Sequence, residues 1–242
     1  MRVEKIKYPM GTLTAEGALI YDETISAKRP AVLMAPNWMG MTDAAIDRGK
    51  LVAGDRYVVF AADMYGQGTR PADFGEAAAL ANPLRENAAE QRKRIGAAYD
   101  AMVAEAGKRN LIDGRRAAIG FCFGGGNVLE LARDGADIAA AVSIHGDLKT
   151  AAAAKKGAVK AKLLVAHGAP DPVAPKTDRD AFESEMDAAG AKWQMLTFSG
   201  VYHAYTDQGS DVPGVAGWDE PACRMTYATT HQFIADAFAG KL

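Results

Sequence analysis

The sequence predicts an α/β fold, with a mostly parallel central sheet of about eight strands covered by helices on both faces. Three observations lead to this prediction. Apolar runs of strand length alternate along the chain with longer stretches of helical spacing. Several of these runs, such as residues 31–35 and 57–62, are apolar almost throughout, which is typical of strands buried on both faces of a parallel sheet. Residues 116–134 read as a strand, a glycine-rich turn and a helix, the unit from which parallel sheets are built.

Local patterns predict the individual elements in chain order. Residues 2–8 and 12–21 alternate or run apolar around Met10-Gly11, which favours two antiparallel strands at a sheet edge. Six further strands are expected at residues 31–35, 57–62, 116–119, 138–144, 162–166 and 192–198. Helices are expected at residues 43–54, 124–134, 177–189 and 219–238, with one or two more within residues 74–107, broken near Asn82-Pro83.

The remaining segments connect these elements. Residues 63–70 and 209–217 are glycine-containing loops, and the Ala-rich residues 151–156 predict no more than a surface helix or loop. No linker and no internal repeat interrupts the alternation of strands and helices. We therefore expect one domain over residues 1–242.

The composition is that of an ordinary globular protein. Of the 242 residues, 49% are hydrophobic and 24% are charged, and the net charge is −2. The Lys and Arg residues are dispersed, which argues against nucleic-acid binding, and no apolar stretch has the length of a membrane span. The N-terminus lacks the apolar core of a signal peptide, and two cysteines do not make a disulfide framework. We therefore expect a cytoplasmic protein, with a monomer as the default state.

The segment Gly120-Phe121-Cys122-Phe123-Gly124-Gly125-Gly126 carries the strongest chemical signal. A strand leads into it and a helix leaves it, so it fits a nucleophile elbow, G-x-nucleophile-x-G, with Cys122 as the nucleophile. The flanking glycines remove Cβ atoms that would collide with the adjoining strand and helix. A phosphate-binding loop is disfavoured because the segment lacks both the Lys-Ser/Thr of a P-loop and the spacing G-x-G-x-x-G. A buried structural cysteine remains the alternative for this segment taken alone.

Two further strand ends supply the partners that thiol catalysis needs. Asp171 follows the strand at residues 162–166 and His203 follows the last strand, and functional residues of open α/β sheets gather at such carboxyl ends. The chain order of nucleophile, acid and histidine is that of the α/β-hydrolase fold. In this triad Cys122 attacks as the thiolate, His203 transfers the proton and Asp171 orients the imidazole.

The oxyanion formed in such a reaction needs preorganised N–H donors. We expect them to be the main-chain N–H of Phe123, in the elbow, and that of Trp38, in the loop after the early strand. Several aromatic residues flank the predicted site, so an apolar, aromatic-lined pocket is expected. No pair of Cys or His has the spacing of a zinc site, and we expect neither a metal nor a cofactor.

The other histidines and the second cysteine are interpreted as structural. His145 and His167 lie at strand ends, each followed by a glycine, and are expected to form structural hydrogen bonds. His231 falls within the last predicted helix. Cys223 has no glycine turn and no nearby base, so it is expected to pack as a small apolar residue.

Five segments, spread over most of the chain from about residue 31 to the last helix, resemble those of a known family. They are Gly120-Phe121-Cys122-Phe123-Gly124-Gly125, Ala62-Asp63-Met64-Tyr65-Gly66, Ser143-Ile144-His145-Gly146, His167-Gly168-Ala169-Pro170-Asp171-Pro172 and Tyr202-His203-Ala204-Tyr205. Together they resemble the dienelactone hydrolase family of α/β-hydrolases. The resemblance implies a Cys-His-Asp hydrolase of small esters or lactones that works through a thioester acyl-enzyme. We expect its substrate pocket near Asn37, Tyr65, Arg70 and Tyr205.

Two positions depart from the family's pattern. Members carry a glutamate after the early strand that helps to deprotonate the cysteine, whereas this chain has Asn37. We expect His203 alone to activate the thiol and Asn37 to hydrogen-bond near the oxyanion. Members also hold the carboxylate of carboxymethylenebutenolide, the dienelactone, with two arginines, at places that fall near Gln67 and at Asp207 here. Arg70 could replace one, but Asp207 would repel a carboxylate, so neutral esters, lactones or thioesters are the expected substrates.

Two other function classes remain open. A glutamine amidotransferase can carry the same elbow, but it needs a carboxylate two residues after the histidine, where this chain has Tyr205. A protein of the same fold that binds a small molecule without turning it over is compatible with Asn37. Such a protein would not need Cys122, Asp171 and His203 together, so the hydrolase is the preferred interpretation.

Overall fold

The central sheet of the computed structural model, which describes residues 1–242, has eight strands: β1 (Arg2–Met10), β2 (Leu13–Tyr21), β3 (Arg29–Ala35), β4 (Val58–Ala61), β5 (Ile112–Phe121), β6 (Ala140–Ile144), β7 (Lys162–Gly168) and β8 (Lys192–Phe198). The helices are α1 (Asp43–Ala53), α2 (Phe74–Arg85), α3 (Ala88–Lys108), α4 (Phe123–Arg133), α5 (Lys176–Ala189) and α6 (Glu220–Phe238). These elements lie where the sequence pattern predicts them, with small shifts at their ends.

The strands follow the order β1-β2-β4-β3-β5-β6-β7-β8. From β4 to β8 every neighbouring pair is parallel, whereas β2 is antiparallel to both β1 and β4. The predicted mostly parallel sheet of eight strands is therefore confirmed. The order reverses between β3 and β5, so the loops after these two strands diverge to opposite faces and leave a crevice between them.

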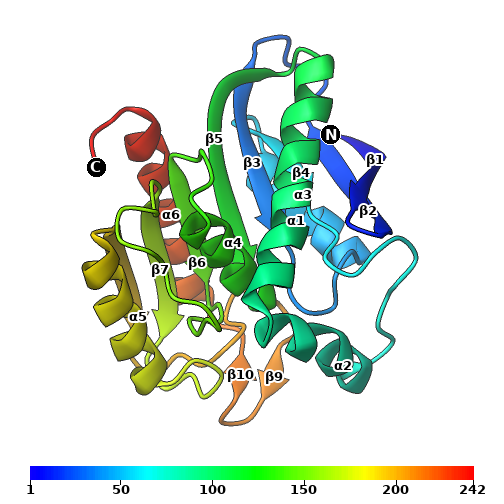
Figure 1. Ribbon diagram of the computed structural model, residues 1–242. Helices are drawn as coiled ribbons and strands as arrows, with labels where there is room; N and C mark the ends of the chain where they lie inside the picture. Colours follow the sequence, from blue (N-terminus) through cyan, green and yellow to red (C-terminus); the bar gives the residue numbers. More distant parts are fainter.

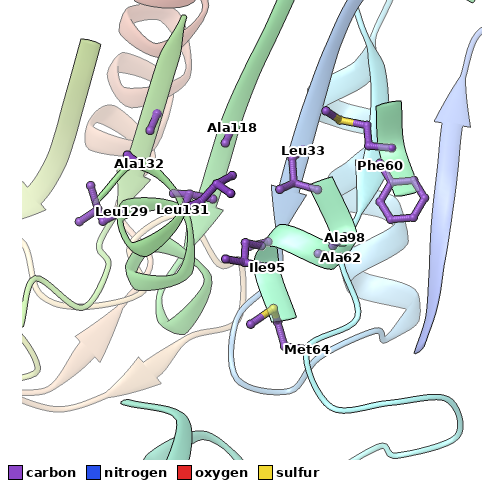
Figure 2. Packing of buried hydrophobic residues seen from close by; sticks show 14 of the residues in the cluster. Leu33, Phe60, Ala62, Met64, Ile95, Ala98, Ala118, Leu129, Leu131 and Ala132 are labelled. Carbon is purple, nitrogen blue, oxygen red and sulfur yellow. The ribbon is translucent and has the colours of Figure 1, made fainter. Parts of the chain in front are cut away.

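Helices cover both faces of the sheet (Figure 1). The core on one face contains residues of α2, α3, α4 and α5, and the core on the other contains residues of α1 and α6. Figure 2 shows the first of these cores, where Leu33 and Ala118 of the sheet meet Ile95 of α3 and Leu131 of α4. Val32, next in the chain to Leu33, faces the opposite core, as the two-residue period of a strand requires. None of the six helices combines the length and the apolarity that crossing a bilayer requires.

The break between α2 and α3 lies later than predicted. α2 continues through Pro83 to Arg85, so the helix does not break at Asn82-Pro83. Pro83 has no N–H to donate to the carbonyl four residues before it, and α2 ends two residues later, at Arg85. Asn87 instead begins α3, since its side chain accepts a hydrogen bond of 3.1 Å from the N–H of Glu90.

Two other segments differ in detail from the expectation. β5 begins at Ile112 and not at residue 116, because Ile112 pairs with Arg29 of β3, ahead of a bulge. Residues 151–156 contain no helix, so the surface loop is the correct alternative of the two that were expected.

A short hairpin interrupts the loop expected at residues 209–217. It consists of β9 (Asp211–Val212) and β10 (Ala216–Gly217), which pair antiparallel. The hairpin, orange in Figure 1, lies beyond the carboxyl ends of the parallel strands. Its main chain also joins the segment after β8, because the N–H of His203 donates to the carbonyl of Val215 and the N–H of Gly217 donates to the carbonyl of His203, both at 3.0 Å.

Candidate active site

Cys122 lies on the sharp turn between β5 and α4. Its backbone dihedrals, φ 53° and ψ −123°, fall in a region that side-chain-bearing residues rarely adopt and that is concentrated at functional sites. A Cβ atom at Gly120 would collide with the backbone of Gly124, and one at Gly124 would collide with the backbone of Ala35 and Pro36. Glycine is therefore required on both sides of the cysteine, and the predicted elbow is present.

Asp171 and His203 come together at the carboxyl ends of β7 and β8. The Nδ1 atom of His203 lies 2.9 Å from Oδ2 of Asp171, and both side chains are buried. The other carboxylate oxygen accepts hydrogen bonds from the N–H groups of Val173, at 2.8 Å, and Ala174, at 3.4 Å. Burial raises the pKa of Asp171, but its hydrogen bonds and the charge of His203 outweigh burial and lower it overall. The carboxylate is therefore ionised and fixed in orientation.

His203 shares a cavity with Cys122. Burial lowers the pKa of the imidazole, but the interactions with Cys122 and with Asp171 act in the other direction and raise it to about 10. An imidazolium is accordingly the form favoured at neutral pH. Because Nδ1 is bonded to Asp171, Nε2 is the ring nitrogen left to face the cavity.

The cavity has a volume of about 780 Å³, and its lining contains both apolar and charged residues. Part of the wall is apolar and consists of Trp38, Met39, Phe74, Leu148, Val173, Val212, Val215 and Ala216. The charged residues of the wall are Arg85, Glu86, Asp147, Lys149, Asp178 and Asp207. Arg85 forms an ion pair with Asp147, with Nε 2.8 Å from Oδ2, and its guanidinium lies over the ring of Phe123. Its charge is therefore close to the elbow.

Asn37 lines the cavity, as predicted, and shapes the loop after β3. Its Oδ1 accepts a hydrogen bond from the N–H of Met39 at 3.0 Å, and its Nδ2 donates to Asp207 at 3.4 Å. Asp207 in turn binds Arg48 at 2.6 Å. The repulsion that Asp207 was expected to exert on a carboxylate is therefore reduced, because Arg48 compensates much of its charge.

Of the two predicted oxyanion donors, Phe123 follows Cys122 in the elbow and Trp38 lines the cavity that contains Cys122. Phe123 is the first residue of α4, where a main-chain N–H has no acceptor within the helix. Trp38 belongs to the turn that Asn37 closes, in which the N–H of Gly40 donates to the carbonyl of Asn37 at 3.0 Å. The elbow and the loop of Trp38 therefore border the same cavity.

Three residues expected in the pocket do not line it. Tyr65 lies behind the wall, since its hydroxyl donates to the carbonyl of Trp38 at 2.8 Å and its ring stacks on Phe123. Tyr205 is completely buried, with its hydroxyl 3.0 Å from Oγ1 of Thr226 in α6. Arg70 turns back to the carbonyl of Thr69 at 2.6 Å. These three pocket assignments are therefore corrected. Tyr65 packs behind the cavity wall, Tyr205 lies in the core against α6, and Arg70 forms a hydrogen bond within its own loop.

Arg85 and the hairpin valines reach the cavity without having been predicted. Arg85 comes from the end of a helix, far in sequence from any strand end. The hairpin could have been anticipated from Val212-Pro213-Gly214-Val215, because a Pro-Gly pair between valines marks a turn between two apolar segments.

His145 and His167 form the structural hydrogen bonds that the sequence suggested. Nε2 of His145 lies 2.8 Å from Oγ1 of Thr206, and Nε2 of His167 lies 2.8 Å from the carbonyl of Ala174. Burial lowers the pKa of His145 well below its ordinary value, so this ring, which packs edge-on against His203, is neutral. No three His, Cys, Asp or Glu side chains converge as a metal site requires.

Comparisons with known proteins agree with this geometry. Residues 17–238 match the dienelactone hydrolase family. The structure of a dienelactone hydrolase-like promiscuous phosphotriesterase from metagenomic libraries is 31% identical over 98% of both chains, with a TM-score of 0.90. A dienelactone hydrolase from Anabaena variabilis shares the fold at 15% identity, covering 100% of this chain and 98% of the other, with a TM-score of 0.67. No curated protein matches the chain in sequence.

A larger enzyme also contains this fold. An acylaminoacyl peptidase is similar over 96% of this chain and 41% of its own, with 15% identity and a TM-score of 0.71. The sheet order, the elbow after β5 and these likenesses together identify the architecture as the α/β-hydrolase fold.

Proposed function

Because the chain belongs to the dienelactone hydrolase family, we propose that it hydrolyses ester or lactone bonds of small, neutral molecules with Cys122 as the nucleophile. One observation carries the proposal. Cys122, held at a positive φ on its elbow, shares a cavity with His203, whose Nδ1 lies 2.9 Å from the buried Asp171. A nucleophile, a proton carrier and an orienting carboxylate in one chain of contacts are the parts of a catalytic triad.

In the acylation step, the thiolate of Cys122 attacks the carbonyl carbon of the substrate and forms a carbon–sulfur bond. The N–H groups of Phe123 and Trp38 donate to the oxygen, which becomes negatively charged. When the tetrahedral intermediate collapses, the carbon–oxygen bond to the leaving group breaks and Nε2 of His203 gives its proton to the departing oxygen. The products of this step are an alcohol and a thioester on Cys122.

In the deacylation step, His203 accepts a proton from water as the water attacks the thioester. A second tetrahedral intermediate collapses, the carbon–sulfur bond breaks, and the acid leaves as Cys122 returns to the thiolate with His203 protonated. Each cycle consumes one ester and one water and yields one acid and one alcohol. The interactions with Cys122 and Asp171 that raise the pKa of His203 to about 10 support its role as the base that takes and holds the thiol proton, so no glutamate at the position of Asn37 is needed.

The charges of the cavity wall favour neutral substrates. Four carboxylates and two cations line it: Glu86, Asp147, Asp178, Asp207, Arg85 and Lys149. The charge of His203 is offset by Asp171, and Arg48 stands behind Asp207. Four carboxylates then face three cations, so a substrate carboxylate meets net repulsion. We expect carboxymethylenebutenolide to be turned over less well than neutral esters of similar size, and a higher kcat/KM for the dienelactone would refute this selectivity.

Phosphotriester hydrolysis is a second candidate. The relative with 31% identity over 98% of both chains is described as a promiscuous phosphotriesterase. A neutral phosphotriester satisfies the charge argument and presents an electrophilic centre with a leaving group, as an ester does. A neutral aryl phosphotriester therefore belongs in the substrate panel, with release of the aryl alcohol as the readout.

The proposal is tested with p-nitrophenyl acetate. Wild type should release p-nitrophenol and carry an acetyl group on Cys122, seen by intact-protein and peptide mass spectrometry. Cys122→Ala should lose both, and His203→Ala should turn over far more slowly, whereas Cys223→Ala should behave as wild type. Absence of turnover and of adduct across esters, lactones and thioesters would favour instead a small-molecule-binding protein.

A further inference from the structure

Exposed apolar side chains gather at the mouth of the catalytic cavity. Phe74 is 63% exposed, Val212 44%, and Val173 and Val215 40% each, and all four line the same cavity. They come from separate segments: the start of α2, the loop before α5, and the β9–β10 hairpin. Exposed apolar residues that converge from distant segments on one cavity indicate a surface that a ligand covers.

The hairpin is the part of this surface that is attached to the catalytic histidine. The N–H of His203 donates to the carbonyl of Val215 and the N–H of Gly217 donates to the carbonyl of His203, both at 3.0 Å. Ala216 forms a parallel bridge with His203. Val215 and Ala216, which line the cavity, therefore lie next to the main chain of His203, whereas Trp38 and Phe74, which stack on each other, form another part of the lining.

The chemistry decides which part of a substrate meets the hairpin. Nε2 of His203 must reach the leaving oxygen to protonate it, so the leaving group has to lie beside His203. We propose that the β9–β10 hairpin is the leaving-group subsite, and that Val212 and Val215 select esters of apolar alcohols. This inference rests on the proposed Cys122 mechanism and adds to it the class of alcohol that is released.

Alkyl acetates isolate this subsite, because the acyl group stays the same while the alcohol grows. A fully buried methylene improves binding about fourfold, so on a half-exposed wall we expect about twofold in kcat/KM per methylene. From ethyl to hexyl acetate, wild type should gain about 16-fold. All acetates give the same acetyl-enzyme, so the deacylation rate constant should not depend on the alcohol.

The variants are Val212→Ser, Val215→Ser and the double substitution, with Val3→Ser as the matched control. Val3 is 38% exposed on β1, outside the cavity, so it tests the same chemical change without the subsite. Serine keeps the main-chain groups that hold His203. The double variant should lose most of the chain-length gain, and its deacylation rate constant, measured from the decay of the acetyl-enzyme made with p-nitrophenyl acetate, should equal that of wild type.

Three results would overturn the proposal. Wild type could show no dependence of kcat/KM on alcohol length, or the double variant could retain the full gain. Deacylation could also fall as much as acylation, which would assign the hairpin a role in positioning His203 alone. If no acetate showed Cys122-dependent turnover, the proposed function itself would fail, and the leaving-group subsite with it.

Discussion

Replacement of Asp171 by Asn removes one buried negative charge and preserves the size of the side chain. In wild type the carboxylate lies 2.9 Å from Nδ1 of His203 and contributes to the pKa of about 10 of that ring. The form of His203 that the acylation step needs is the imidazolium, which is lost as the pH rises through its pKa. Because the substitution lowers this pKa, we expect the alkaline limit of activity to move to lower pH.

The size of the shift follows from the geometry. With the two charge centres roughly 4 Å apart and an effective dielectric constant near 20, their interaction amounts to about 4 kcal/mol. This corresponds to about three pKa units, so the alkaline limit of kcat/KM should move from near pH 10 to about pH 7. At pH 9 the variant should retain about 1% of the wild-type imidazolium, and the lost orientation of the ring lowers the rate further.

The assay is the pH profile of kcat/KM for p-nitrophenyl acetate between pH 6 and 10.5, with Cys122→Ala as the blank for spontaneous hydrolysis. Asp187→Asn is the matched control, because Asp187 also accepts a hydrogen bond from a ring nitrogen, Nε1 of Trp193, at 2.8 Å, but lies outside the cavity. The control should keep the wild-type profile. An Asp171→Asn profile of reduced height with an unmoved alkaline limit would refute the electrostatic role of this carboxylate.

Three further predictions follow from the elbow and its loop. Asn37→Ala removes the acceptor that shapes the loop of Trp38, the proposed oxyanion donor, and should lower kcat/KM on esters about 10- to 100-fold. An unchanged kcat/KM would exclude this role. Gly120→Ala places a Cβ against backbone and should lower the free energy of unfolding, measured in urea, by about 3 kcal/mol or more, whereas Gly96→Ala, in open space on α3, should raise it by about 0.5–1 kcal/mol. Burial raises the pKa of Cys223, so iodoacetamide at pH 7 should label Cys122 first; preferential labelling of Cys223 in peptide mass spectra would contradict this.

The candidate triad could be predicted from the sequence because three independent constraints meet there. Each member follows a strand, parallel strands end at the same edge, and the elbow requires glycine at fixed positions. A residue's place after a strand in the sequence therefore predicts that it lies at this edge of the sheet. The same reasoning located the loop of Asn37 and Trp38, which follows β3 beside the reversal of strand order.

The pocket wall could not be predicted in the same way. Tyr205 stands two residues after His203, but at the turn its ring goes into the core against α6 and not into the cavity. Arg70 and Tyr65 both lie in the loop after β4, yet the hydrogen bond to Thr69 keeps Arg70 in its own loop, and the hydrogen bond to Trp38 holds Tyr65 behind the wall. Arg85 reaches the cavity from the end of a helix, and which way a helix end points depends on packing that no local pattern reports.

The two hydrogen bonds between His203 and the hairpin have an evolutionary consequence. They use main-chain groups only, so substitutions at positions 212 and 215 can alter the preference for an alcohol while the imidazole stays in place. An insertion or deletion between Val215 and Gly217 would instead change which peptide groups pair with the main chain of His203. Among descendants of this protein that adapt to new substrates, the hairpin should therefore diverge in its side chains and keep its length.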